Sequence, residues 1–480
     1  MGRHLASKRF GNAARRPGGR LLLGLLGLLP AVPLLLPAQA VDTARLADSL
    51  RAIVTEGIRE RAFPGAQVLV LHRGEVLFHE AFGYHTYDSL RPVQPGHLYD
   101  LASITKVSGP LPALMRLFGQ GRFDPDAPLK QYLPGFRHSN KAGLTFREML
   151  AHQARLRPWI PYWQGTLKGH ARYPWQKRWN AARTNDGRFR ARTLRTDSSR
   201  RFPIRITDSL WLHRRFAEKR IYKAIRKSPL LEEAGYRYSG LLFYLLPGLI
   251  EQLSGQDYRR YLQEEIYRPI GARTLGYRPL ERFPRSRIVP TERDTFFRRQ
   301  LLHGVVHDEG AALMNGVSGN AGLFGTAEDM GKLMQLYLQR GIWAGDTLLR
   351  PEVVDQFTTY QYPGNRRGLG FDKPPLKYVW GQSYIAPGAS PRSFGHAGYT
   401  GTFAWVDPEA ELVFVFFVEP GVPHAPQSQA VPVEPAAAHA PGGVPGRGAR
   451  VSAAGANSFA SGPKHAYQKR FQAGRSLFLL

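Results

Sequence analysis

The 480-residue sequence contains no cysteine. The chain therefore has no disulfide, no cysteine for lipid attachment and no thiolate metal site. Acidic residues are scarce as well, because 37 Asp and Glu stand against 66 Lys and Arg and leave a formal net charge of +29. Hydrophobic residues make up 43% of the chain, enough to bury the core of one large domain or two medium ones. We therefore expect a folded protein, not a disordered one.

Residues 1–40 have the layout of an export signal. Six Lys and Arg, with no acidic residue, precede an apolar run from Leu21 to Leu36, and Ala38-Gln39-Ala40 follows as a small-x-small cleavage site. The apolar run is short for a membrane span and contains two prolines. We predict cleavage after Ala40 and an exported protein, either periplasmic or secreted.

The excess of positive charge is concentrated in one segment. Residues 167–228 hold 19 Lys and Arg against four Asp and Glu. Aromatic side chains are interleaved with these charges, a pattern that would also suit a nucleic acid. For an exported protein, however, a solvated loop or a contact with an anionic envelope polymer is favoured over nucleic acid.

The most informative motif is Ser103-Ile-Thr-Lys106. On a helix, Ser103 and Lys106 would share one face. A desolvated lysine held there can be neutral and take the serine proton, which activates the hydroxyl as a nucleophile. The spacing alone is also typical of a solvated lysine at a helix N-terminus. A second such pair, Ser461 and Lys464, lies in a Gly/Pro-rich tail that cannot start a helix. The apolar residues that follow the first pair have helical spacing, and Pro110 fits if the helix is short or if Pro110 lies in a first turn.

Hydrophobic periodicity predicts the arrangement of the rest of the chain. We expect helices over Leu46–Arg61, from Leu144 to Leu150, over Leu241–Leu253 with a kink at Pro247, and over Phe324–Arg340 with Thr326 opening it. We expect strands over Gln67–His72, Glu75–Phe82, Gly401–Val406 and Glu411–Val418. Strands at both ends with helices between them predict an α+β fold. Its antiparallel sheet comes from both ends of the chain and is flanked by helices, and a mainly helical domain is inserted at roughly 107–300.

Two later residues could complete a site with Ser103. Tyr238 stands just before an apolar run, and its hydroxyl could relay protons to a leaving group. His396 opens a strand between glycines, which let the backbone approach a ligand while the imidazole points into a cleft. Each residue alone is typical of a packing tyrosine or a turn histidine. The three signals carry more weight together than separately.

When the residues around Ser103, Tyr238 and His396 are included, the chain resembles the serine β-lactamase-related family. This family includes class C β-lactamases, DD-peptidases and some esterases. The resemblance covers about Leu46 to Val418. Its three motifs are Tyr99-Asp-Leu-Ala-Ser-Ile-Thr-Lys106, Tyr238-Ser-Gly240 and His396-Ala-Gly398. It implies a β-lactamase/transpeptidase-like serine hydrolase domain over 41–418, acting through an acyl-serine intermediate on a β-lactam, a D-alanyl peptide or a small ester.

The resemblance also implies roles for single residues. Ser103 is the expected nucleophile, Lys106 its base and Tyr238 the group that passes the proton to the leaving group. The backbone N–H groups of Ser103 and Tyr399, the latter directly after Gly398, form the expected oxyanion hole. His396 is expected to hydrogen-bond a carboxylate or polar group of the substrate.

The sequence departs from the family pattern at Gly240. The family has Asn or Asp there, whereas glycine has no side chain to position Lys106 or a substrate amide. This leaves a second interpretation open, in which the chain is a catalytically weak or inactive protein that binds cell-wall peptide or β-lactam. The basic segment 167–228 also lengthens the interval between the first two motifs, which predicts a loop or subdomain over the cleft.

The end of the chain departs from the family as well. Relatives finish with a long helix packed on the sheet, whereas 419–480 is rich in Pro, Ala and Gly and is predicted to be disordered. Lineage-specific divergence and a frameshift near Phe417 would each explain this tail. An amphipathic helix encoded in another reading frame of the gene would identify the frameshift.

Other hydrolase classes lack their motifs here. The sequence has no Gly-x-Ser-x-Gly elbow of an α/β-hydrolase. His303 and His307 are four residues apart, but the His-Glu-x-x-His order is missing, and Asp308 and Glu309 are expected to fix a loop near the cleft. We expect no metal and no cofactor.

Overall fold

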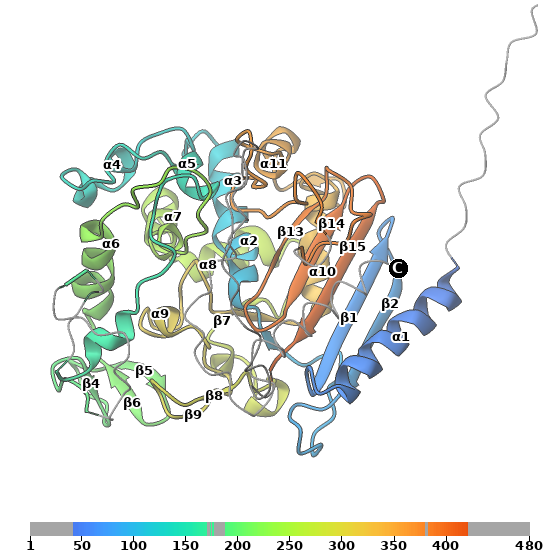
Figure 1. The fold of residues 1–480 in the computed structure, drawn as a ribbon, viewed down its shortest axis with the longest axis horizontal. Coiled ribbons are helices and arrows are strands. Elements are labelled where there is room, and N and C mark those ends of the chain that lie inside the picture. Colours follow the sequence, from blue (N-terminus) through green and yellow to red (C-terminus); the bar gives the residue numbers. More distant parts are fainter. Residues whose placement is uncertain (1–41, 170–172, 174, 177–187, 380–382, 421–480) are drawn as a thin grey trace, which may run out of the picture. The chain divides into compact units, whose positions relative to one another are not determined.

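The computed structural model describes residues 42–169, 173, 175–176, 188–379 and 383–420. The chain divides after Asp42, and the helices and strands named here all belong to the part from Thr43 onward (Figure 1). The predicted export signal lies outside the described residues, and so do positions 421–480 of the predicted tail. Glu419, which opens that predicted tail, is buried. Within the described ranges, no helix combines the length and apolarity needed to cross a membrane.

A five-stranded antiparallel sheet forms the centre of the fold, in the order β13-β14-β15-β1-β2. Its strands are β1 (Gly65–His72), β2 (Glu75–Gly83), β13 (Phe394–Ala397), β14 (Phe403–Asp407) and β15 (Leu412–Val418). The first and last strands of the described chain lie side by side, with Ala66 opposite Val418 and Val70 opposite Phe414 (Figure 1). The α+β prediction, with a sheet built from both ends of the chain, is therefore confirmed.

Helices cover both faces of this sheet. Alternate residues of β1 point to opposite faces, so Leu69 joins the large core cluster while Val68 joins a smaller one. The smaller cluster contains Leu50 and Val54 from α1 (Thr43–Arg59). On the other face, α10 (Ala327–Leu338) packs against β1, β14 and β15 (Figure 1). Because both faces are buried, β15 is a continuous apolar run with no polar alternation.

Several local predictions hold. The hairpin β1–β2 turns at Arg73-Gly74, and α1 lies two to three residues from its predicted bounds. Thr326 caps α10, where its hydroxyl oxygen accepts a 3.3 Å hydrogen bond from the Asp329 N–H. The helix predicted over Leu241–Leu253 is present as α7 (Leu246–Ser254), which Gly255 ends in the left-handed conformation. Pro247, however, does not kink that helix. It lies in the first turn, where a missing N–H removes no helical hydrogen bond.

The inserted region 107–300 is less helical than predicted, because the basic segment contains a three-stranded sheet of β4 (Leu194–Arg195), β5 (Ile204–Thr207) and β6 (Leu210–Leu212). The remaining helices are α2 (Thr105–Ser108), α3 (Pro110–Gly119), α4 (Leu129–Tyr132), α5 (Phe146–Leu150), α6 (Lys223–Lys227), α8 (Tyr258–Leu262), α9 (Glu309–Ala312) and α11 (Pro351–Thr358). The remaining strands are β3 (Tyr99–Asp100), β7 (Gly276–Tyr277), β8 (Arg293–Asp294), β9 (Gln300–Leu301), β10 (Leu323–Gly325), β11 (Ile342–Trp343) and β12 (Asp346–Thr347).

The helix after Ser103 is short because it breaks at Gly109, and Pro110 opens α3 at its first position, as one of the sequence interpretations required. The break leaves backbone carbonyls without helical partners. Buried tyrosines satisfy them, since Tyr337 donates to Val107 O at 2.7 Å and Tyr267 donates to Ser108 O at 2.7 Å.

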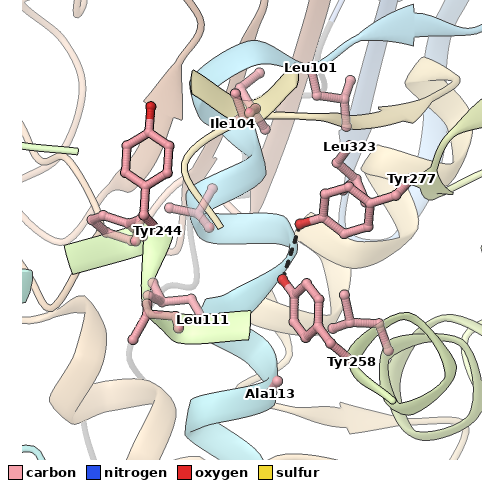
Figure 2. Packing of buried hydrophobic residues seen from close by; sticks show 14 of the residues in the cluster. Leu101, Ile104, Leu111, Ala113, Tyr244, Tyr258, Tyr277 and Leu323 are labelled. Carbon is pink, nitrogen blue, oxygen red and sulfur yellow. Dashed lines mark hydrogen bonds between the residues drawn. The ribbon is translucent and has the colours of Figure 1, made fainter. Parts of the chain in front are cut away.

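Two further tyrosines lie against Gly109. The hydroxyls of Tyr258 and Tyr277 are 3.0 Å apart (Figure 2), and a Cβ on Gly109 would lie within 3 Å of both oxygens. Only glycine lets them approach the break this closely. The hydroxyls of these four buried tyrosines thus form a polar cluster inside the core, and this cluster supports the segment that carries Ser103 and Lys106.

Candidate active site

Ser103 lies in a 3₁₀ turn, Ala102–Ile104, that runs directly into α2. The strand β3 comes just before this turn in the chain and is paired with β10, which fixes where the turn begins. Ala102 has φ +44, in the left-handed region that alanine rarely adopts. The Asp100 carboxylate holds this conformation by accepting a 2.9 Å hydrogen bond from the Ala102 N–H. The strained Ala102 directly precedes the candidate nucleophile and so helps to set the direction of its side chain.

Lys106 lies on the same face as Ser103, as the three-residue spacing predicts. Its Nζ donates a 2.9 Å hydrogen bond to Ser103 Oγ and another of 2.9 Å to the backbone oxygen of Asn320. The side chain is only 2% exposed. The ammonium nitrogen also lies 5.4 Å from the ring centre of Tyr238 and 5.5 Å from that of Phe243. Lys106 therefore touches the serine from a desolvated, largely aromatic pocket.

Tyr238 reaches the same serine from the other motif. Its hydroxyl donates to Ser103 Oγ at 3.4 Å, although the two residues are 135 positions apart. The loop that carries Tyr238 is attached to His152, whose backbone oxygen accepts from Arg237 N at 2.8 Å and whose Nδ1 accepts from Ser239 N at 3.2 Å. The His152 and Tyr238 rings are 4.6 Å apart. Sequence analysis did not identify His152.

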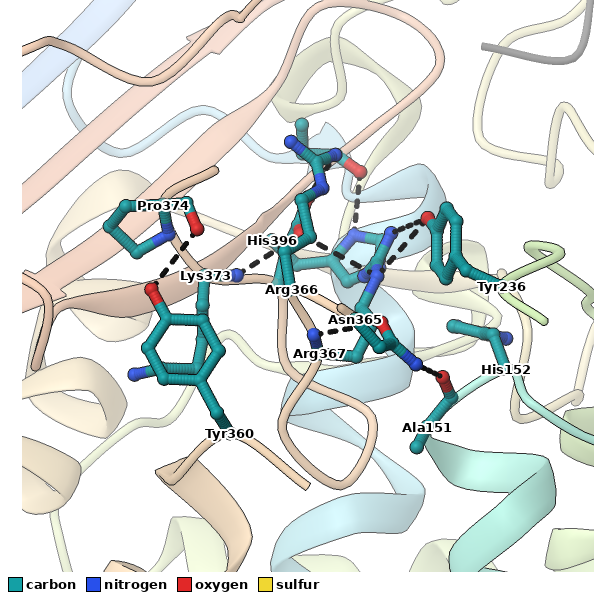
Figure 3. Close-up of polar contacts among 12 residues, drawn as sticks. Ala151, His152, Tyr236, Tyr360, Asn365, Arg366, Arg367, Lys373, Pro374 and His396 are labelled. Carbon is teal, nitrogen blue, oxygen red and sulfur yellow. Dashed lines mark hydrogen bonds and ion pairs between the residues drawn. The ribbon is translucent and has the colours of Figure 1, made fainter. Parts of the chain in front are cut away.

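Arg367 is a site residue that sequence analysis missed. It is 3% exposed and lies 5.1 Å from the ring centre of Tyr238. Its Nη2 donates to the Tyr236 hydroxyl at 2.9 Å, and its Nε lies 3.5 Å from an Asp372 carboxylate oxygen (Figure 3). Burial lowers the pKa of this guanidinium, but Asp372 outweighs burial and raises the pKa above its ordinary value. Nη1 has no hydrogen-bond partner within the described part of the chain.

His396 lies in β13 and is 3% exposed (Figure 3). Its Nδ1 is 2.7 Å from the Ala397 carbonyl oxygen, which can only accept, so Nδ1 carries the proton. Burial, then the charges of Arg367 and Lys106, hold the pKa of His396 well below its ordinary value. The imidazole is therefore neutral and its Nε2 is an acceptor, without a partner among the residues described. Of the two expected partners of His396, a neutral acceptor nitrogen favours a polar group that carries a proton over a carboxylate.

Gly398 brings the end of β13 against the serine turn. A Cβ on Gly398 would meet Thr402 Oγ1 and lie 3.1 Å from Ala102 Cβ, so only glycine fits this close approach. Tyr399 follows Gly398 in the chain. Ser103, Lys106, Tyr238 and Gly398 thus lie together, and the ring centres of His396 and Tyr238 are 6.0 Å apart.

Tyr399 is 41% exposed, and its ring stacks on His307 with 5.5 Å between centres and 15° between planes. Burial lowers the pKa of His307, but the Glu292 carboxylate 3.2 Å away outweighs burial and raises that pKa to about 9. The backbone N–H of His307 also donates a 2.8 Å hydrogen bond to the Asp100 carboxylate. His307 is therefore a cation attached to Asp100, the residue whose carboxylate also accepts from the Ala102 N–H. In the described ranges, no three His, Asp or Glu side chains are grouped to hold a metal ion.

Gly240 leaves space where the family has a side chain. A Cβ there would have Asn320 Cβ as its nearest neighbour, at 3.8 Å. The Asn320 side chain is occupied, since it accepts from Ser318 Oγ at 2.6 Å and donates to Tyr244 at 3.2 Å. Its backbone oxygen, however, holds Lys106. Sequence analysis could not find this contact, because every residue carries a backbone carbonyl.

The chain is similar to known proteins over most of its length. The family model described as "Beta-lactamase" matches residues 50–433. A putative D-alanyl-D-alanine carboxypeptidase of Escherichia coli (strain K12) is 29% identical over 395 residues, which cover 76% of this chain and 80% of that protein. An N-acetylmuramyl-L-alanine amidase of Bacillus subtilis (strain 168) is 28% identical over 377 residues, covering 73% and 76%. The crystal structure of a penicillin-binding protein homologue from Caulobacter crescentus matches with a TM-score of 0.53 at 19% identity, covering 78% of this chain and 91% of that one.

Proposed function

Because the chain belongs to the beta-lactamase family and is a serine hydrolase, we propose that Ser103, Lys106 and Tyr238 carry out acyl transfer on an amide or ester substrate. The observation that carries the proposal is the convergence on one oxygen. Ser103 Oγ lies 2.9 Å from Lys106 Nζ and 3.4 Å from the Tyr238 hydroxyl. Both distances are within or near hydrogen-bond reach, so a proton can pass between the serine oxygen and either group.

In the proposed reaction, neutral Lys106 takes the hydroxyl proton while Ser103 Oγ bonds to the substrate carbonyl carbon. The carbonyl oxygen becomes an oxyanion, stabilised by the backbone N–H groups of Ser103 and Tyr399. Tyr238 gives its proton to the leaving nitrogen or oxygen and regains one from Lys106. The bond to the leaving group then breaks and leaves an acyl-serine ester. Water attacks this ester, releases the acid and returns the proton to Ser103.

The proposed substrate is a D-alanyl peptide, or a β-lactam that mimics one, with small esters as further substrates. The two sequence relatives, named as a D-alanyl-D-alanine carboxypeptidase and an N-acetylmuramyl-L-alanine amidase, support a peptide or amide of the cell wall. His396 refines the proposal, because its neutral Nε2 is suited to accept a hydrogen bond from a substrate N–H or O–H. The substrate carboxylate would instead meet positive charge elsewhere around the site.

The proposal is tested with a fluorescent penicillin and a p-nitrophenyl ester, each applied to the wild type and to Ser103→Ala. We expect covalent labelling and ester hydrolysis in the wild type, and neither above background in the variant. Labelling with no turnover would favour the weak binding protein that Gly240 left open. Equal hydrolysis by the two proteins would overturn the role of Ser103.

Export completes the proposed function. We propose that residues 1–40 are removed after Ala40, that the hydrolase domain spans 41–418, and that the mature protein acts in the periplasm or outside the cell. The leader composition supports this. The N-terminal sequence of the protein recovered outside the cytoplasm tests it, and an uncleaved Met1 would contradict it.

We also propose that the basic segment 167–228 contacts an anionic envelope polymer and not nucleic acid. Its 15 net positive charges support the contact. Affinity for lipopolysaccharide or teichoic acid should fall steeply as salt rises. Affinity that does not change with salt would argue against it.

A further inference from the structure

One cavity of the structure is lined by residues that do not belong to the Ser103 site. It has a volume of about 550 Å³. Its lining comes from two stretches, the loop between β2 and β3 and the short 3₁₀ turn around residue 286. The lining residues are Leu90, Arg91, Pro92, Gln94, His97, Ser286 and Arg287. None of them belongs to the site around Ser103, and none is acidic.

Two guanidinium groups supply the charge of this cavity. Neither Arg91 nor Arg287 is paired with a carboxylate in the described part of the chain. Within the described residues, the Arg287 guanidinium donates one hydrogen bond, of 2.9 Å to the Gly96 carbonyl, and lies over the Phe283 ring. Arg91, Arg287 and His97 line the same cavity, and burial followed by the two arginine charges lowers the pKa of His97. Two arginines gathered around one cavity without a counter-ion have the charge to hold an anion.

His97 adds a neutral donor. Its Nδ1 accepts from the Gln94 N–H at 3.1 Å, which fixes Nδ1 as an acceptor. His85 Nε2, 2.8 Å from the same nitrogen, must then be the donor of that pair. The proton of neutral His97 therefore sits on Nε2. No hydrogen bond to another described residue uses it. A histidine that is neutral and has its donor nitrogen defined in this way can hydrogen-bond an anion oxygen.

We propose that this cavity binds a phosphate group carried on a larger organic molecule. Arg91 and Arg287 would contact its charged oxygens, and His97 Nε2, the Gln94 amide and the Ser286 hydroxyl would donate to the remaining lone pairs. Phosphate offers enough acceptor oxygens for this many donors, and its charge matches two guanidinium groups. The volume exceeds that of inorganic phosphate, which leaves room for the group that carries it.

The experiment measures binding of inorganic phosphate, glycerol 3-phosphate and a short glycerol phosphate oligomer by calorimetry at constant ionic strength. Acetate at the same ionic strength is the control ligand. We expect saturable phosphate binding that acetate does not reproduce. Tighter binding of the oligomer identifies a phosphodiester chain as the carrier, and tighter binding of glycerol 3-phosphate identifies a small phosphoester.

The variants are Arg91→Gln and Arg287→Gln, with Arg340→Gln as the matched control. Arg340 is an exposed arginine already paired with Asp355 and outside the cavity. We expect each cavity variant to weaken phosphate binding at least tenfold, and the control to leave it unchanged. Arg91 makes no structural hydrogen bond with its guanidinium in the described residues, so its variant remains informative if Arg287→Gln disturbs the Gly96 contact.

Ester hydrolysis should stay at the wild-type rate in Arg91→Gln, because Arg91 is not part of the Ser103 site. Equal binding by all variants, or equal heats with acetate, would overturn the proposal and leave only general charge screening.

Discussion

The guanidinium of Arg367 lies 5.1 Å from the ring centre of Tyr238 and donates to the hydroxyl of Tyr236, two residues earlier in the same loop. Lys106 approaches the same ring, at 5.4 Å. Tyr238 therefore has the charge of Arg367 beside it, and a second positive charge once Lys106 has taken the serine proton. Positive charge close to a phenol stabilises the negative charge that appears on its oxygen as the proton leaves. We therefore expect Arg367 to be a positioning residue that acts through Tyr238.

Arg367→Met should therefore lower kcat more than it raises KM. Acid–base groups contribute on the order of 100-fold or more to rate, so a residue that supports one is expected to cost roughly tenfold. Arg367→Lys keeps the charge but loses the paired N–H donors that bind Tyr236. Its kcat should therefore lie between those of the wild type and Arg367→Met. Steady-state ester hydrolysis measures this.

Arg340→Met is the control, because it removes a guanidinium from a surface ion pair. Asp372 keeps Arg366 and Tyr384 as partners in the Arg367 variants, so the fold should persist. A normal kcat in Arg367→Met, with the melting temperature unchanged, would rule out the positioning role.

Gly240→Asn should restore a side chain toward Lys106. The position has room, since its nearest neighbour would be 3.8 Å away, and its φ lies outside the left-handed region. One added hydrogen bond is worth about 0.5–1.5 kcal/mol, so kcat should rise about two- to tenfold. Acylation by the fluorescent penicillin measures the gain.

Gly398→Ala is the opposing control for that variant. Its Cβ would meet Thr402 and Ala102, so both acylation and stability should fall. If Gly240→Asn folds normally but acylates no faster, the backbone oxygen of Asn320 already positions Lys106 fully.

The stability of the protein should depend on the protonation of His307. Folding raises the pKa of His307 from 6.5 to about 9, so the folded state favours the protonated form. The stabilisation is complete below pH 6.5 and is lost as the pH rises through 9. Its size is roughly 3 kcal/mol. Urea unfolding at several pH values between 6 and 10 measures the loss.

His307→Gln should flatten the pH dependence of stability in that window, because the amide can still donate to Glu292 but does not titrate. An unchanged slope in the variant would assign the pH dependence to another group.

Tyr337→Phe should destabilise the segment that carries Lys106. The hydroxyl satisfies the backbone oxygen of Val107, and a buried acceptor left without its donor costs about 1–3 kcal/mol. Urea unfolding gives the free energy. Tyr162→Phe is a matched control, since its buried hydroxyl has no hydrogen-bond partner among the described residues and its loss should be neutral or stabilising. Equal effects of the two substitutions would show that the cap at Val107 contributes nothing.

The sequence by itself determined most elements and the catalytic motifs. Apolar spacing located α1, the first hairpin and the last two strands, because a residue's face depends on the local helical or extended period. The Ser-x-x-Lys spacing placed Ser103 and Lys106 together, since three residues on a short helical turn return to the same face. Pro247 was misjudged, because its effect depends on where the helix begins.

Only the tertiary structure decided the electrostatics of the site. Arg367 joins Tyr238 from a distant loop, and Asn320 holds Lys106 through a backbone oxygen. Neither contact leaves a pattern in the sequence. The neutral state of His396 likewise results from burial beside Arg367 and Lys106, and the charge of His307 from its contact with Glu292. Protonation depends on the surrounding charges and solvent exposure, which are set only when segments far apart in the chain pack together.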